Sequence, residues 1–463
     1  MGRMLAGIAP IAIGLAIGLA IGLFATPGLA QEKLAIWWAK GAYQAEDDAL
    51  LAVVRKFEAR SGVKVELTWH AASEMIPKLT AAVDAGAPPD IAYADAFNLQ
   101  AAGRWAFEGK LEDISDLMAP IKDRFAPNTA EAAWLASGKT GKRAYYAFPL
   151  KQQTLHIQYW KDILAASGFK ENDIPYTWQE YWAFWCDRVQ PAFRASAGAA
   201  VFGVGSPMGI ESTDSYKSFL AWLDAYDVKL VDEGGKILVG DAKVRQGLID
   251  ALKAYTDLYA KGCTPPQSTA WKDGDNDLAF NGRTVVMTPN SSLPIADKWL
   301  DDANNARLAA PQRAQGRKAY DELIATAGLP RKPGGAPLLS RADVKLGAIF
   351  QASRNKARAR DFVKFLMEED NLRPYVESAL GRWFPVTRDG QKSVFWQADR
   401  QRKSVYDQFM AGTVPFEFTS NYRFATLDNE NVWAKAMQRV VNDKVPVDKA
   451  VDELIARIKD VAG

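Results

Sequence analysis

The sequence predicts an α/β fold arranged in two lobes, and three observations support this prediction. Residues 33–69 read as strand, helix and strand, a βαβ unit that implies a parallel sheet. Strands and helices then alternate to the end of the chain. The chain has 463 residues, 48% of them apolar, and this length and apolar content favour two lobes over one.

The first βαβ unit is defined by its helix. Residues 33–38 are the predicted first strand, 45–60 the helix and 63–69 the second strand, which alternates apolar and polar residues. Acidic residues fill the first turn of the helix and basic residues the last, and Gly62 follows. This order agrees with the helix macrodipole and with a glycine C-terminal cap.

Later segments continue the alternation. Thr177 and Glu180 form a capping-box pattern before one helix, and Gly262 ends another. The polar residues 151–153 interrupt a strand-rich segment, and residues 302–340 are predicted to be a long surface excursion. The predicted helices cover 73–86, 243–260, 429–439 and 447–458, and the predicted strands lie at 91–93 and within 142–160, 200–207, 283–292 and 344–353.

The first thirty residues are typical of a secretory signal peptide. Arg3 precedes an apolar stretch over residues 5–24, and a Thr-Pro-Gly break leads to a small-x-small triplet before Gln31. We expect cleavage after Ala30; the alternative is an uncleaved anchor, because the stretch is long enough to span a bilayer. The mature chain is therefore expected to be exported.

The charge balance gives no argument for nucleic acid or anionic membrane as a partner. Removal of residues 1–30 leaves 433 residues with 56 basic and 55 acidic side chains, since Arg3 is the only charge removed. Cys186 and Cys263 either form one disulfide or stay as two buried thiols. The two histidines, His70 and His156, have no ligand spacing, so no metal site is expected.

Enzyme motifs are absent from the sequence. It contains no GxSxG elbow, no Walker loop, no HExxH and no dinucleotide fingerprint, and the segment "GVGSPMG" lacks the spacing and the lysine of a phosphate loop. No catalytic residue and no cofactor site is marked out by a motif, although the 55 acidic residues leave room for a pair of facing carboxylates.

Aromatic residues gather instead where the predicted strands end. Trp37 and Trp38 end the first strand, Trp69 and His70 the second, and Phe97 follows the third closely. Ligands of open α/β sheets bind outside the carboxyl ends of strands, and an aromatic face can stack on a sugar ring. Because neighbouring strand residues point to opposite faces, one of the tryptophan pair should pack under the sheet. Trp38, at the tip, is predicted to be the exposed stacking platform.

Several segments together resemble the bacterial extracellular solute-binding proteins of carbohydrate ABC importers, distantly including the maltose-binding proteins. They include "KLTAAVDAGAPPDIAYAD", "YYAFPLKQQTLHIQYWKDILAASGF", "PYTWQEYWAF", "AFNGRTVVMTPNSS" and "GRWFP", in this order. One departure is Trp160, which stands where many relatives have asparagine.

The resemblance implies two lobes joined by crossing strands, with the ligand bound between them by hinge closure. One lobe would hold residues 31–148 and 345–385, and the other 149–344 and 386–463. No catalysis is implied, and the partners would be the permease subunits of an ABC importer and a small carbohydrate or polyol, with the receptor a monomer. The implied ligand-binding residues are Trp37, Trp38, Lys40, Trp69, His70, Asp95, Phe97, Lys151, Gln152, Ser206, Met208, Asp214, Asn290, Ser291, Arg382, Trp383, Asn421 and Tyr422.

Three functions are weighed. The first is a periplasmic receptor for a sugar, an oligosaccharide or a polyol. The second keeps the fold but binds a phosphorylated polyol or a glycerophosphodiester, with Lys40, Lys151 and Arg382 on the phosphate. The third is a secreted polysaccharide hydrolase with two facing carboxylates. Trp182, Trp185 and Trp222 follow helical spacing and are assigned to the core.

Overall fold

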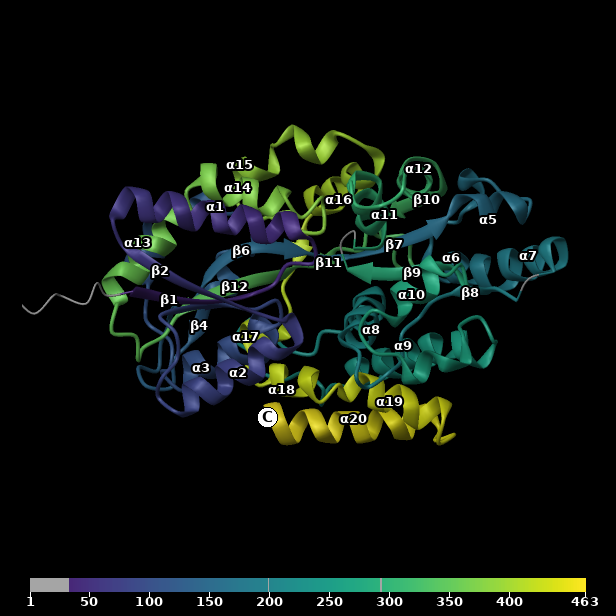
Figure 1. Cartoon of the computed structure of the whole chain (residues 1–463). Coiled ribbons are helices and arrows are strands. Elements are labelled where there is room, and N and C mark those ends of the chain that lie inside the picture. Colours follow the sequence, from purple (N-terminus) through teal and green to yellow (C-terminus); the bar gives the residue numbers. More distant parts are fainter. Residues whose placement is uncertain (1–32, 199, 292–293) are drawn as a thin grey trace, which may run out of the picture.

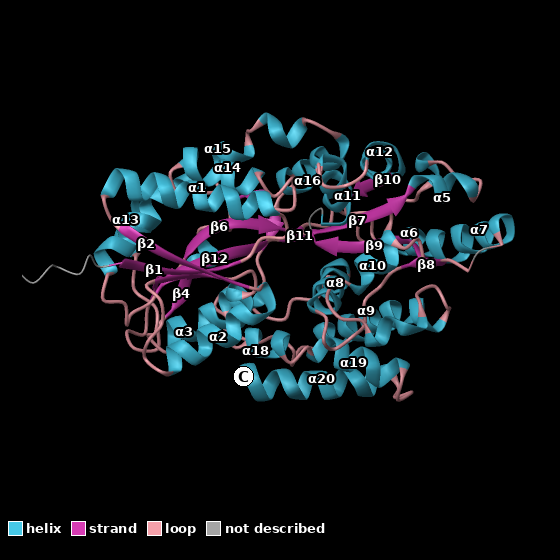
Figure 2. Ribbon diagram, in the orientation of Figure 1, coloured by secondary structure: helices cyan, strands magenta, loops and turns pink. Residues whose placement is uncertain are grey.

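The structure is a computed structural model that describes residues 33–198, 200–291 and 294–463. Two lobes lie side by side, each with a central sheet covered by helices on both faces (Figures 1 and 2). The predicted signal peptide, residues 1–30, lies outside the described residues. Within the described part of the chain, no helix is long and apolar enough to cross a membrane.

The first lobe is built on a six-stranded sheet of order β13-β6-β12-β3-β1-β2. β1 runs parallel to β2 and β3, which confirms the predicted βαβ unit. β12 is antiparallel to β3 and β6, so the sheet is mixed and not parallel throughout. The strands are β1 (Lys33–Ala39), β2 (Lys64–His70), β3 (Ile91–Tyr93), β6 (Phe148–Gln153), β12 (Asp343–Ile349) and β13 (Phe384–Pro385), with β4 (Trp134–Ala136) and β5 (Arg143–Tyr145) paired beside it.

Helices cover both faces of this sheet (Figure 2). On one face Phe57 packs edge-on against Phe362, and α1 ends at Gly62, whose φ of 71° suits a glycine. The helices of this lobe are α1 (Gln44–Ser61), α2 (Ala72–Asp84), α3 (Gly103–Phe107), α4 (Ser115–Met118), α13 (Lys356–Leu366), α14 (Glu369–Glu377) and α15 (Arg388–Gln391).

The second lobe is built on a four-stranded sheet of order β10-β7-β9-β8. Its core contains Trp182, Trp185 and Trp222, as predicted from their spacing. The strands are β7 (Leu155–Trp160), β8 (Phe202–Val204), β9 (Val285–Ser291) and β10 (Ile324–Ala327). The helices are α5 (Lys161–Ala166), α6 (Trp178–Ala183), α7 (Gln190–Ala197), α8 (Thr213–Ala225), α9 (Ala242–Ala260), α10 (Asp275–Asn281), α11 (Pro294–Asn304), α12 (Ala310–Lys318), α16 (Arg400–Met410), α17 (Glu417–Ser420), α18 (Phe424–Asn429), α19 (Val432–Val441) and α20 (Val447–Ala462).

The chain crosses between the two sheets at Thr154, the residue between β6 and β7. Strand β6 therefore extends beyond the predicted lobe limit at 148/149, and β12 begins before the predicted limit at 344/345. The polar residues 151–153 do not interrupt the strand, because their backbone pairs with β12 and β13. A short ladder of β11 (Ser340–Arg341) and β14 (Thr413–Val414) lies near the crossings (Figure 1).

Residues 302–340 were predicted to be a long surface excursion, but only part of this segment lies on the surface without regular structure. The segment contains the end of α11, all of α12 and the edge strand β10, which pairs antiparallel with β7. Tyr320 and Ile324 are buried in the core of the second lobe. The prediction was wrong here because composition alone does not reveal an edge strand that is paired through its backbone.

A disulfide joins Cys186 and Cys263, whose Cα atoms are 5.1 Å apart. It ties the segment after α6 to the end of α9 within the second lobe. Of the two alternatives left open by the sequence, the structure shows the bridge.

A buried acid makes the second lobe sensitive to pH. Asp428, in α18, is 5% exposed, and its Oδ1 accepts a hydrogen bond from Trp433 Nε1 at 2.8 Å. Burial raises the pKa of Asp428 to about 7, the Trp433 hydrogen bond opposes this, and the nearby charge of Glu417 adds to it. The folded protein therefore holds a proton that the unfolded chain releases near pH 4.

We expect Asp428→Asn to remove this dependence, because the amide keeps the acceptor for Trp433 and cannot ionise. A raised pKa in the folded state means that stability falls as the pH rises from about 4 to about 7. The variant should gain about 1–4 kcal/mol over the wild type between pH 4 and pH 8. Urea unfolding at several pH values measures this gain, and a constant difference between the two proteins would contradict it.

Candidate functional site

A cavity of about 490 Å³ lies between the lobes and is lined by residues from both. On the first-lobe side, the residues just after β3 and those in the loop before β13 form part of its wall. The first-lobe lining is Ala72, Ser73, Ile76, Asp95, Ala96, Leu99, Gln100, Gln153, Lys345, Arg382 and Trp383. The second-lobe lining is Thr213, Asp214, Lys217, Asp273, Gly274, Asp277, Asn290 and Ser291.

Beneath the first-lobe wall lies a buried group of charged and aromatic side chains. Lys151 Nζ is 3.3 Å from Glu46 Oε2, and the indole nitrogen of Trp383 donates to the same oxygen at 3.0 Å. The Lys151 ammonium also lies 4.4 Å from the centre of the Trp383 ring and 5.1 Å from that of Tyr93. These contacts hold Trp383 in place, so that its position does not depend on a ligand.

Asp343 connects the wall to the second lobe. Its Oδ2 accepts from Gln153 Nε2 at 2.9 Å and from Lys345 Nζ at 2.7 Å, and Lys217 Nζ of α8 lies 3.3 Å away. Its Oδ1 accepts from Asn98 Nδ2 at 2.7 Å. One carboxylate at the start of the crossing strand β12 therefore contacts both lobes.

The carboxyl groups in the cavity differ in their environment. Burial alone would raise the pKa of Asp95, but the charges of Lys151, Arg382 and Lys345 hold it below its usual range. Across the cavity, burial and the charge of Asp214 raise the pKa of Asp277 to about 7. Cations thus outweigh burial at Asp95 on the first-lobe wall, whereas on the second-lobe wall the charges of Lys217 and Arg382 do not outweigh burial at Asp214 and Asp277.

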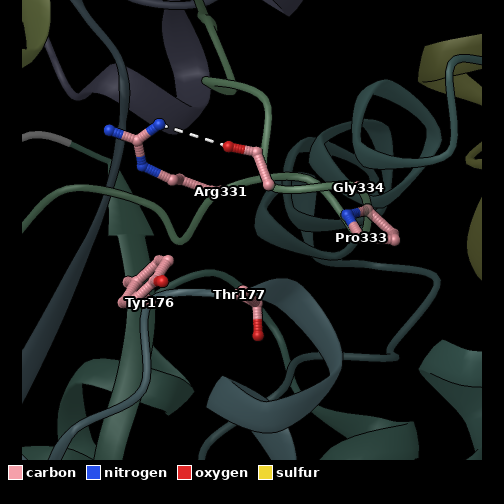
Figure 3. A pocket seen from close by; sticks show the side chains of 6 residues that line it. Tyr176, Thr177, Arg331, Pro333 and Gly334 are labelled. Atoms are coloured by element: carbon pink, nitrogen blue, oxygen red, sulfur yellow. Dashed lines mark hydrogen bonds between the residues drawn. The ribbon is translucent and has the colours of Figure 1, made fainter.

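A larger hollow of about 820 Å³ lies on the second lobe, between the residues before α6 and the loop over residues 331–335 (Figure 3). Its one charged side chain is Arg331, whose Nη1 donates to the carbonyl oxygen of Gly335 at 3.2 Å. Tyr176 is 70% exposed. This surface hollow has few groups that could bind a solute, so the cavity between the lobes is the candidate site.

Comparison with known proteins agrees with this choice. The profile of the bacterial extracellular solute-binding protein family matches residues 52–404. The chain belongs to this family. No curated protein matches this solute-binding protein by sequence.

Solved structures share the fold of this solute-binding protein. An ABC transporter solute-binding protein from Thermotoga lettingae TMO, bound with α-D-tagatose, has a TM-score of 0.72 at 18% identity, over 93% of this chain and 100% of that one. A sugar transporter protein from Arthrobacter chlorophenolicus A6, with bound laminaribiose, has a TM-score of 0.70 at 13% identity, over 93% and 99%. Maltose-bound MalE3 of T. maritima has a TM-score of 0.69 at 17% identity, over 92% and 99%.

The structure brings together six of the residues predicted for the site. These six line the cavity from both lobes: Asp95, Asp214, Asn290, Ser291, Arg382 and Trp383. Their role in binding remains a prediction, but their convergence supports it. The other predicted residues lie elsewhere.

Trp38 is not an exposed platform. Its side chain is fully buried, its Nε1 donates to Tyr375 Oη at 3.0 Å, and its ring lies 4.7 Å from that of Tyr93. Helix α14, which carries Tyr375, covers this face of the sheet. Trp37 is the partly exposed member of the pair and packs edge-on against His70 with ring centres 4.9 Å apart. One tryptophan of the pair is buried, as predicted, but the buried residue is Trp38 and not Trp37.

Three more residues at the strand ends lie outside the cavity lining. Lys40 is exposed, and its backbone nitrogen donates to the His70 carbonyl oxygen at 2.8 Å. Trp69 is half-buried within β2, which is an edge strand of its sheet. Phe97 is buried against Trp105 with ring centres 5.8 Å apart.

The crossing strand presents a different residue from those predicted. Lys151 is buried in its ion pair with Glu46, and Gln152 Nε2 donates to the Pro385 carbonyl oxygen at 2.8 Å. Gln153 lines the cavity instead. The sequence marks the polar triplet but does not show which member faces the ligand, because the pleat depends on pairing with β12 and β13.

The loop before α8 and the segment before α18 also differ from the prediction. Ser206 and Met208 are buried, and only the end of their loop reaches the cavity, at Thr213 and Asp214. Asn421 Nδ2 donates to the Gly235 carbonyl oxygen at 3.0 Å. Tyr422 stacks on Phe107 with ring centres 4.7 Å apart, a contact that joins the lobes away from the cavity.

Several cavity residues were not predicted from the sequence, notably Lys217, Asp277 and Lys345. Asp277 lies in the first turn of α10, where acidic residues commonly stabilise the start of a helix. Lys345 lies within a strand that was predicted only as an apolar run. No signal in the sequence separated these residues from other surface charges.

We expect Trp38→Phe to affect stability and not solute binding. The substitution removes a buried donor and indole packing, so it should lower the free energy of unfolding by about 1–3 kcal/mol. Trp37→Phe, at the half-buried neighbour, is the matched control and should change it less. A loss of solute affinity in Trp38→Phe at unchanged stability would restore Trp38 as a ligand contact.

We expect Asp343→Asn to lower the free energy of unfolding by about 3–5 kcal/mol, because it leaves Lys345 buried without its partner and removes the charge facing Lys217. Asp389→Asn is the control: its ion pair with Lys392 is 75% exposed on both sides and should contribute close to nothing. Chemical denaturation of both variants makes the comparison, and equal small effects would show that Asp343 is dispensable.

Proposed function

We propose that this protein is the substrate-binding receptor of an ABC importer and binds a sugar, an oligosaccharide or a polyol between its lobes. The observation that carries the proposal is the cavity of about 490 Å³, which both lobes line with hydrogen-bonding side chains. Family membership and neighbours bound with tagatose, laminaribiose and maltose support it.

The lining suits hydroxyl groups. A sugar hydroxyl both donates and accepts hydrogen bonds, and the cavity offers acceptors such as Asp95 and donors such as Gln153 and Arg382. Trp383, which is 2% exposed and is held by Glu46 and Lys151, forms the rigid backing of this wall. Closure of the lobes would bring the two sets of side chains onto one ligand.

The other elements of the proposal are predictions from the sequence and from the family resemblance. Residues 1–30 would direct export and be removed, and the receptor would work in the periplasm as a monomer that delivers its ligand to permease subunits. It would bind without catalysis. The phosphate alternative has less support, because Lys40 lies outside the cavity lining and Lys151 is paired with Glu46. The hydrolase alternative has no support in the family match.

Ligand screening tests the proposal. Residues 31–463 would be titrated with monosaccharides, disaccharides, amino sugars and polyols, followed by thermal shift and by tryptophan fluorescence. At least one of them should raise the melting temperature and change the fluorescence, since binding to the folded state alone stabilises it. No response to any sugar, amino sugar or polyol would refute the carbohydrate assignment.

Two variants locate the site for whichever carbohydrate binds. Trp383→Ala should weaken its binding at least tenfold, because it removes the buried indole that backs the first-lobe wall and contacts Glu46 and Lys151. Lys40→Ala is the control: it removes an exposed side chain outside the lining and should leave the affinity within twofold. Equal affinities for both variants would place the site elsewhere.

A further inference from the structure

The two walls of the cavity differ in charge. On the first-lobe side every carboxylate faces a cation: Glu46 pairs with Lys151 at 3.3 Å and Asp343 with Lys345 at 2.7 Å, and the charge of Arg382 acts on Asp95. None of these groups needs a charged ligand for compensation.

The second-lobe wall has more carboxylates than cations. Asp214 and Asp277 both line the cavity, and the one cation on this wall is Lys217, whose Nζ lies 3.3 Å from Asp343 of the crossing strand. Asp273, at the rim, already accepts hydrogen bonds from the backbone nitrogen and the hydroxyl of Thr213. The charges of Lys217 and Arg382 act on Asp214, and that of Arg382 on Asp277, but Lys217 also faces Asp343 and Arg382 also faces Asp95. The excess of negative charge therefore lies at Asp214 and Asp277.

Hydrogen bonding at this wall has the same asymmetry. The Asn290 amide nitrogen donates to Asp277 Oδ1, which directs the amide oxygen of Asn290 away from that contact. Among the described side chains, none donates to Asp277 Oδ2. The wall thus presents acceptors and negative charge next to a cavity of about 490 Å³. Burial and the charge of Asp214 raise the pKa of Asp277 to about 7, although the charge of Arg382 lowers it.

We propose that the ligand carries a protonated amino group, as in an amino sugar or an aminopolyol, and that this group binds between Asp214 and Asp277. An ammonium has three donors, no acceptor and a positive charge, and so complements two neighbouring carboxylates. The hydroxyl groups of the same ligand would face Asp95, Gln153 and Arg382 on the opposite wall. This inference rests on the proposed function and narrows its substrate class.

The test compares matched sugars that differ by one group. Glucose, galactose, mannose and cellobiose would be titrated by calorimetry beside their 2-amino-2-deoxy counterparts at pH 6.5, where the amines are protonated. At least one amino sugar should bind tenfold or more tightly than its neutral parent. The N-acetylated forms, which lack the charge, should bind like the parent or more weakly.

Two variants test whether the preference for amino sugars depends on the carboxylates of the second-lobe wall. Asp277→Asn and Asp214→Asn should each reduce the ratio of amino-sugar to parent affinity at least fivefold. Asp275→Asn is the matched control, because it removes a carboxylate from the same helix turn, outside the cavity lining, and should keep the ratio. Circular dichroism and melting temperature show whether each variant is folded, and if one wall variant does not fold, the other decides.

The outcomes separate this inference from the proposed function. If neutral sugars bind as tightly as amino sugars, the proposal of a protonated amino group is wrong, and the proposed function as a carbohydrate receptor still stands. If glucose 6-phosphate binds most tightly, the proposal of a protonated amino group is also wrong. Putrescine is an amine without hydroxyl groups. If it binds as tightly as any amino sugar, the proposal of an ammonium site stands and the carbohydrate assignment is refuted. No binding by any of these compounds would overturn both.

Discussion

The buried carboxylate of Asp343 is the interaction on which the two-lobe arrangement depends. It stands where the chain enters the crossing strand β12, and it accepts from Gln153 and Lys345 while facing Lys217 of the second lobe. A buried charge is tolerated only when its partners are close and well oriented. The positions of β6, β12 and α8 are therefore coupled at one point, and the cavity walls begin there.

The same principle explains why the first-lobe wall is preorganised. Lys151 is 2% exposed and would be costly to bury alone, but Glu46 and three aromatic rings surround it. Glu46 in turn fixes Trp383 through its indole nitrogen. A wall held by its own side chains has less conformational freedom to lose when a ligand binds, whereas the second-lobe wall keeps carboxylates that its own cations do not neutralise. Under the proposed function, this division between a self-compensated wall and an acidic one would select among polar solutes of similar shape.

The order of the elements was largely predictable. Local signals such as the acidic start, basic end and Gly62 cap of α1 act within a few residues, so the βαβ unit, the core tryptophans of the second lobe and the last two helices were predicted correctly. Antiparallel pairing of β12 and the edge strand β10 were not, because they depend on backbone partners far away in the sequence. About a third of the cavity lining was predicted in the same way. Asp95, Arg382 and Trp383 stand close after a strand or in a conspicuous segment, while Asp277 and Lys345 resemble any other charged residue until the lobes meet.

The sequence by itself determined the α/β class, the family resemblance and the presence of one buried tryptophan at the end of the first strand, since these depend on composition, periodicity and short motifs. Only the tertiary structure decided which tryptophan is buried, which member of the polar triplet 151–153 faces the cavity and where the excess of negative charge lies. The physical reason is that the direction of a side chain in a strand depends on which neighbours pair with it. The state of a charge likewise depends on the groups that folding brings within a few ångströms, and those groups lie up to hundreds of residues apart, as Glu46 and Trp383 do.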